Sequence, residues 1–268
     1  MNKQPILCYL DFTELTDNLQ QWVNHIHTAF KVPVDLLFVR DHNTDLVMGK
    51  SIKDASILKA MNDFRKSSGA TEGENFIREG CNCSLISQLA EERDALFMLI
   101  PVHKRRDVQF LGCTTLLKML RRSRIPALVI PENNQFNKPG SISVAINYRK
   151  AQKSVTPWAA HLSKKMELTI KMIVPLSDED GVHHNASFAK KFWSNHGLTV
   201  DVEKDTVKAF AADKYALKNT DIHCLHLSRQ PGFFERLLGD QDSYLLANKA
   251  GTPVFCINPG DKLYIPCT

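Results

Sequence analysis

The chain contains the same pattern twice. In each half, an aspartate opens an apolar run, a glycine follows a polar stretch, and a proline opens a second apolar run. These residues are Asp94, Gly112 and Pro126 in the first half, and Asp221, Gly239 and Pro253 in the second. In both halves the glycine lies 18 residues after the aspartate, and the proline lies 14 residues after the glycine. An internal repeat of this size predicts two tandem copies of one domain.

The stretch ENNQFNKPG, residues 132–140, reads as the linker between the copies, because it is polar and ends in a Pro-Gly pair. We therefore expect a first domain over residues 1–135 and a second over residues 141–268. A chain of 268 residues suits two domains of ordinary size.

Short apolar runs alternate with amphipathic stretches in both halves. In the first half we expect strands at 5–10, 34–39, 75–78, 95–102 and 127–131, and helices at 15–30, 53–67, 84–93 and 111–122. In the second half we expect strands at 141–147, 168–174, 198–203, 222–227 and 254–258, and helices at 154–163, 187–196, 207–218 and 233–249. This order predicts an α/β fold of two doubly wound domains, each a five-stranded parallel sheet with helices on both faces. We expect two such sheets rather than one continuous sheet.

Composition narrows the classes of partner. The formal net charge is +5, but no dense stripe of Lys and Arg interleaved with aromatic residues occurs, so we expect anionic small ligands and no nucleic acid. The N-terminus lacks the features of a signal peptide, and no run of about 18 apolar residues occurs. Seven cysteines, an odd number, fit free thiols in a reducing compartment. We expect a cytoplasmic protein that does not insert into membranes.

The chain resembles the universal stress protein family in its tandem two-domain form. Three features carry the resemblance: LCYLD ending at Asp11, the stretch from residue 95 through a loop into a helix, and the proline-led runs IPALVIP and TPVFCIN. The resemblance implies an adenine nucleotide alpha hydrolase-like fold with strand order 3-2-1-4-5. It also implies that the halves associate through their last strands as a pseudo-dimer, and that whole chains pair as a homodimer.

The nucleotide-binding signature of that family is degenerate here. Family members that bind nucleotides carry Gly, two residues, Gly, nine residues, Gly, and then Ser or Thr. With Gly112 as the last glycine, Leu99 and Val102 occupy the first two positions, and Cys113 occupies the Ser/Thr position. With Gly239 as the last glycine of the second half, the corresponding residues are His226, Arg229 and Asp240, and Asn147 stands where the first half has Asp11. We therefore expect nucleotide binding in the first domain at most.

Ligands of open α/β sheets bind beyond the carboxyl ends of the strands, where the strand order reverses. The resemblance implies Asp11 on the adenine side and Val39 in the adenine pocket. The run 103–106, HKRR, could clamp an anion, and Gly112 opens a helix whose N–H groups could do the same. The expected ligand-binding residues are Asp11, Thr13, Val39, His103, Lys104, Arg105, Gly112, Cys113 and Thr114. The alternatives are a solvated surface loop at 103–106, a helix cap at Asp11, and ordinary N-capping near Thr114.

No catalytic or metal site emerges from the sequence. No nucleophile, base and orienting group come together in a motif, so we expect no enzyme. Cys81 and Cys83 are too closely spaced for a usual zinc site, and we expect His183 and His184 in an exposed polar loop. ATP or another adenine nucleotide in the first domain is the one cofactor the resemblance implies. Two functions stay open: a regulatory protein that binds a nucleotide or small anion, and a dimerisation scaffold in the stress response that binds no nucleotide.

Overall fold

The computed structural model describes residues 3–12, 16–40, 53–103, 113–146, 152–176, 180–208, 218–227 and 251–257. The first half contains strands β1 (Ile6–Leu10), β2 (Val34–Arg40), β3 (Asn75–Glu79), β4 (Met98–Val102) and β5 (Ala127–Pro131), and helices α1 (Thr16–Phe30), α3 (Asp54–Ser67), α4 (Asn82–Glu92) and α5 (Cys113–Leu120). The second half contains β6 (Ser141–Ala145), β7 (Thr169–Leu176), β8 (Val200–Lys208), β9 (Ile222–His226) and β10 (Val254–Ile257), with helices α6 (Gln152–Met166) and α7 (Asp180–Asn195).

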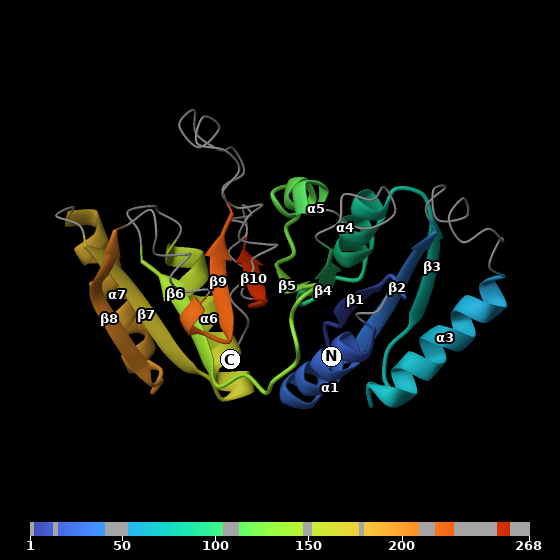
Figure 1. Ribbon diagram of the computed structural model, residues 1–268, viewed down its shortest axis with the longest axis horizontal. Coiled ribbons are helices and arrows are strands. Elements are labelled where there is room, and N and C mark those ends of the chain that lie inside the picture. The colour runs from blue at the N-terminus through green and yellow to red at the C-terminus, as the bar shows by residue number, and fades with distance from the viewer. Residues whose placement is uncertain are drawn as a thin grey trace.

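Each half has the predicted parallel topology. The strand order is β3-β2-β1-β4-β5 in the first half and β8-β7-β6-β9-β10 in the second, which is order 3-2-1-4-5 twice. The expectation of two separate sheets is wrong, because β5 and β10 pair antiparallel and join the halves into one ten-stranded sheet. Figure 1 shows β5 and β10 beside one another in the middle of the molecule, with β3 and β8 towards its two ends. The joining strands are the ones through which the family resemblance implies association.

Alternate residues of the strands feed two cores on opposite faces of the sheet. One core continues across both halves and receives the buried stripes of α1, α3, α6 and α7. The other core receives the stripes of α4 and α5. In α1 the buried residues follow the helical spacing of three and four that the sequence shows: Leu19, Trp22, Val23, Ile26 and Phe30. The first half is therefore doubly wound, as predicted.

The second half departs from prediction in two places, and two predicted helices there are not tested. Strand β8 extends to Lys208, so Val207 and Lys208 belong to a strand and not to the predicted helix 207–218. The rest of that helix, apart from Lys218, and all of the predicted helix 233–249 lie outside the described residues. His183 and His184 lie exposed on α7, not in a loop. No described helix is both long and apolar enough to cross a bilayer.

The strand register corrects the repeat alignment near β4 and β9. Met98 pairs with the residue after Pro126, and His223 pairs with the residue after Pro253. Met98 and His223 are thus equivalent and 125 positions apart, whereas the two prolines are 127 positions apart. Asn219, rather than Asp221, is therefore level with Asp94. Likewise, Cys224 and Leu227 are level with Leu99 and Val102, which corrects the predicted placement of His226 and Arg229.

The two aspartates also have different contacts. Asp94 has a φ of 47° and accepts a hydrogen bond from Gln4 Nε2 at 2.7 Å. Asp221 Oδ2 accepts hydrogen bonds from the backbone N–H groups of Gly140 and Ser141, at 3.0 and 2.9 Å, and from the Ser141 hydroxyl at 2.7 Å. Asp221 therefore holds the start of β6 against the start of β9 mainly through backbone N–H groups, whereas Asp94 contacts the segment before β1 through the Gln4 side chain.

The linker between the halves is anchored at Asn134. Its Oδ1 accepts hydrogen bonds from Trp22 Nε1 at 2.7 Å and from Asn18 Nδ2 at 3.2 Å, both on α1. Its Nδ2 donates to the carbonyl of Gly251, just before β10, at 2.8 Å. One side chain therefore ties the linker to the first half and to the second. Halves that moved independently would have to break this junction.

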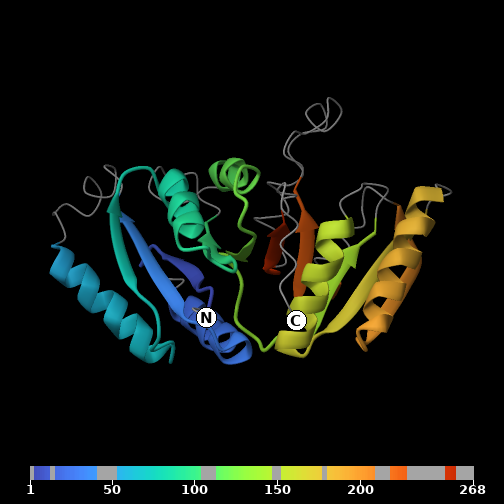
Figure 2. The ribbon, with the colours of Figure 1, turned by 180° about the vertical axis from the view of Figure 1, so that it is seen from behind.

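Aromatic rings pack across the same junction. Phe30 of α1 meets Phe97 at 5.4 Å and His161 of α6 at 5.5 Å between ring centroids. Phe255 of β10 meets Phe97 at 5.7 Å and Trp158 of α6 at 5.3 Å. Figure 2 shows α1 and α6 at the foot of the molecule on the two sides of the linker. The halves thus share a packed core as well as a sheet.

Because the backbone of Asn133 lies close to Gly251, alanine should destabilise the protein more at Gly251 than at a glycine in open space. Gly251 has a φ of +73°, and a Cβ there would lie 2.8 Å from the Asn133 carbonyl oxygen. Gly197 is a matched control, with a φ of +68° and no atom within 4 Å of its Cβ position. Gly197→Ala should lower the free energy of unfolding by about 1 kcal/mol, and Gly251→Ala by about 2 kcal/mol or more, in urea titrations. Equal losses would contradict the close packing at this junction.

Because of His161, the stability of the protein should depend on pH. Burial, followed by repulsion from Lys165 and Lys164, lowers the pKa of His161 from 6.5 to about 4. The folded state therefore binds fewer protons than the unfolded chain between those values. The free energy of unfolding should fall as pH drops from 6.5 to 4, and this contribution should vanish above 6.5. In denaturant titrations across this range, His161→Phe should flatten the slope, whereas His184→Phe, at an exposed position on α7, should leave it unchanged.

Candidate functional site

A buried aspartate–histidine pair bridges the carboxyl ends of β1 and β4. Asp11 directly follows β1, and His103 directly follows β4. Asp11 Oδ2 and His103 Nε2 lie 2.7 Å apart, and each side chain is only 8% exposed. The strand order reverses between β1 and β4, so the pair lies where an open α/β sheet places its ligand. The structure therefore brings together two predicted site residues that are 92 positions apart in sequence.

The other predicted site residues fall into two groups. Val39 is 3% exposed, and its side chain belongs to the core beneath α4 and α5. Cys113 and Thr114 lie in the first turn of α5, so Thr114 is inside the helix rather than at its cap. Thr13, Lys104, Arg105 and Gly112 lie outside the described residues.

The edge contains two residues that the sequence reading did not single out. Phe12 adopts a φ of 51°, which turns the chain immediately after Asp11, and its ring packs 5.5 Å from that of Phe38. Nothing in the sequence marks Phe12, because left-handed backbone is uncommon for aromatic residues. Arg40, at the end of β2, binds Asp54 of α3 at 2.6 Å and Glu79 of β3 at 2.9 Å. The sequence did offer a signal for Arg40, because it is a cation that comes directly after an apolar run. Together, Phe12 and Arg40 fix the ends of β1, β2 and β3 at this edge.

Burial disfavours the thiolate form of three described cysteines. Burial raises the pKa of Cys83 to about 11, with the neighbouring Cys81 adding to the effect. Burial also raises the pKa of Cys8 and of Cys224 far above the ordinary range. Within the described ranges, no group of three His, Cys, Asp or Glu residues is arranged to hold a metal ion.

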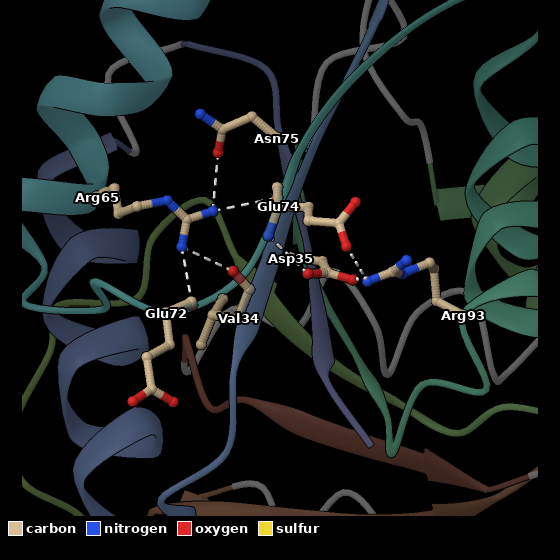
Figure 3. Close-up of polar contacts among 7 residues, drawn as sticks. All are labelled: Val34, Asp35, Arg65, Glu72, Glu74, Asn75 and Arg93. Atoms are coloured by element: carbon tan, nitrogen blue, oxygen red, sulfur yellow. Dashed lines mark hydrogen bonds and ion pairs between the residues drawn. The ribbon is translucent and has the colours of Figure 1, made fainter. Parts of the chain in front are cut away.

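A buried carboxylate anchors the helix that covers this edge. Asp35 of β2, with a side chain 1% exposed, binds Arg93 Nε at 2.9 Å and accepts a hydrogen bond from the Glu74 N–H at 2.8 Å (Figure 3). Arg93 also binds the Glu74 carboxylate at 2.7 Å. Because Arg93 directly follows α4, these bonds fix the C-terminal end of that helix to β2. The N-terminal end of α4 is thereby held over the carboxyl edge of the sheet.

Arg65 of α3 fastens the turn before β3 in the same region. Its guanidinium donates only to oxygens of the protein, at 2.8 to 3.1 Å (Figure 3). The acceptors are the carbonyls of Val34, Ala70, Glu72 and Glu74 and the side-chain oxygen of Asn75. Three of these contacts come from Nη1 and two from Nη2, so both terminal nitrogens bind the protein itself and Arg65 is a structural residue.

The second half performs the equivalent anchoring with opposite charge. The strand registers place Lys171 of β7 level with Asp35 of β2. Lys171 Nζ donates to the carbonyl of Asn219, just before β9, at 2.8 Å. Lys171, a cation bound to a carbonyl, thus stands where the first half has Asp35, a carboxylate bound to Arg93.

Solved structures share this fold over nearly the whole chain. A universal stress protein from Archaeoglobus fulgidus DSM 4304 matches 96% of this chain and 97% of its own, with a TM-score of 0.67 and 16% identity. A functionally unknown protein from Pseudomonas aeruginosa PAO1 matches 97% of this chain and 94% of its own, with a TM-score of 0.67 and 14% identity. No protein-family model and no curated protein matches the sequence. The predicted resemblance is confirmed at the level of the fold.

The anchoring of α4 can be tested by removing its cation. Arg93→Ala leaves the Asp35 carboxylate buried without a counter-ion and should cost about 3 kcal/mol of unfolding free energy in urea titrations. Arg78 is the matched control, because both guanidinium groups lie against the Phe76 ring, at 5.7 Å for Arg78 and 5.3 Å for Arg93. Arg78→Ala should cost under about 1 kcal/mol. The double variant Asp35→Asn/Arg93→Ala should recover part of the loss. Indistinguishable losses for Arg93→Ala and Arg78→Ala would sink the proposed anchor.

Proposed function

We propose that this chain, which has the universal stress protein fold over nearly its whole length, is a cytoplasmic regulatory protein that binds a nucleotide or small anion. It binds the ligand in its first domain, residues 1–135, at the carboxyl edge of the sheet. The observation that carries the proposal is the Asp11–His103 pair, 2.7 Å apart and almost fully buried. A buried polar pair at the strand-order reversal offers a ligand both a donor and an acceptor.

The remaining contacts come from the segments around this pair. Thr13 follows Asp11 in sequence, and Val39 ends the apolar part of β2. Lys104 and Arg105 supply positive charge next to His103, and Gly112, Cys113 and Thr114 stand at the start of α5. Free N–H groups at a helix start favour an anion. The ligand is therefore AMP, ATP, a nucleoside or a simple phosphate.

The second domain, residues 141–268, does not bind the ligand. By the strand registers, Asn147 and Ser228 take the places of Asp11 and His103. The second half therefore lacks both residues of the Asp11–His103 pair. The domain instead completes the sheet through β10. The protein acts by binding and not by catalysis.

A second candidate function is a scaffold that binds no nucleotide. The β5–β10 pairing and the Asn134 junction support it, because they make one chain into a fixed pair of domains. Whole chains would then pair as homodimers.

The proposal is tested by ligand-induced thermal shifts of the full chain with AMP, ATP, adenosine and inorganic phosphate. A ligand at a hundredfold excess over its Kd adds about 2.7 kcal/mol, which raises the Tm by several degrees. The rise should shrink in Asp11→Asn, in His103→Ala and in Lys104→Ala/Arg105→Ala. It should persist in the control Asp63→Ala, which removes an exposed carboxylate from α3. If none of the four compounds raises the Tm of the wild type, the scaffold function replaces the binding function.

A further inference from the structure

Asn82 is a buried polar residue at the start of α4. It is 8% exposed and shares the inward-facing stripe of the helix with Ile86, Leu89 and Ala90. Most residues on such a stripe are apolar, because they face the core. An amide at this position therefore needs a hydrogen-bonding partner.

Within the described chain, the Asn82 side-chain oxygen has no such partner. Its Oδ1 is inaccessible and accepts no hydrogen bond from any described residue. Burying an unsatisfied polar atom destabilises a protein, and natural structures keep few of them without a reason. Helix capping is not the reason here. Cys81 occupies the N-cap position, and no side chain caps the helix.

Asn82 lies at the same edge of the sheet as the proposed site. Helix α4 follows β3, so its first turn lies at the carboxyl edge of the sheet. Ile86 and Leu89, on the same stripe, pack in one core with Val39 at the end of β2. Asn82 therefore lies on the Val39 side of the edge that carries Asp11 and His103. The Asp35–Arg93 pair holds α4 in this position from its other end.

We infer that the Asn82 carboxamide is a ligand contact of the first domain, an inference that rests on the proposed function. A buried carbonyl oxygen without a donor fits a ligand that carries N–H or O–H groups. A nucleoside carries such groups, since a carboxamide pairs with the amino group and ring nitrogen of adenine. The ligand class therefore narrows to nucleosides and nucleotides, and inorganic phosphate alone does not use Asn82.

The experiment compares Asn82→Leu and Asn82→Ala with the wild type, using AMP, adenosine and inorganic phosphate as probes. The control is Gln88→Ala, at an exposed position on the same helix. Without ligand, Asn82→Leu should melt at or above the wild-type Tm, because it removes an unsatisfied buried group. With ligand, both Asn82 variants should bind AMP and adenosine about tenfold or more weakly, the loss expected for one buried hydrogen bond. Their phosphate affinity, and every affinity of Gln88→Ala, should be unchanged.

The outcomes separate the two proposals. If wild type binds AMP or adenosine and the Asn82 variants bind it equally well, Asn82 is no contact, although the proposed function stands. If the variants also lose phosphate affinity in proportion, or if Asn82→Leu melts clearly below wild type, Asn82 has a structural role and the inference falls. If wild type binds none of the three probes, the inference fails, and the proposed function fails with it only if ATP is not bound either.

Discussion

The antiparallel pairing of β5 with β10 is the interaction on which the architecture depends. Each strand is the last of its half and would otherwise leave an unpaired apolar edge, which soluble proteins usually cover. Their union places Phe97 against Phe255 and allows α1 and α6 to cover one continuous core. The linker can then be short and fixed, with Asn134 bonded to both halves. Neither half is a complete unit without the other.

Within this symmetric frame the two halves have different chemistry. The first half carries a histidine–carboxylate pair at its strand-order reversal and an unsatisfied amide on α4. In the second half, polar side chains gather instead at the beginning of the strands. There Ser143 Oγ lies 2.9 Å from His223 Nδ1, and both residues are fully buried. Ser143 also lies 2.9 Å from the Thr220 hydroxyl, so this cluster is internally bonded. Among the described residues, the polar pair of the first half therefore lies at the carboxyl edge of the sheet, whereas this polar cluster of the second half lies at the opposite edge.

Hydrophobic periodicity was sufficient to predict the strands, their alternation with helices and the helix stripes, since these depend on which residues avoid water. The order of the strands in the sheet came from the family resemblance. The joining of the two halves into one continuous sheet was harder to predict, because the pairing of β5 with β10 links residues far apart in the sequence and has no local signal. The equal spacing of Asp94 and Asp221 misled the alignment by two residues, because it matched residue types in different structural positions. At the site, Asp11 and His103 could be named from sequence. The turn at Phe12 and the burial of Asn82 could not, because both depend on tertiary contacts.

Two copies of one topology in a single chain carry a risk of exchange, in which a strand of one half enters the sheet of the other during folding. The reversed charges of Asp35 and Lys171 bear on this risk. If β7 took the place of β2, Lys171 would face Arg93 where the native chain supplies a carboxylate. If β2 took the place of β7, Asp35 would face the carbonyl of Asn219 without a donor. Each exchange would leave a charged side chain without its native partner, so the opposite charges of Asp35 and Lys171 favour the native place of each strand.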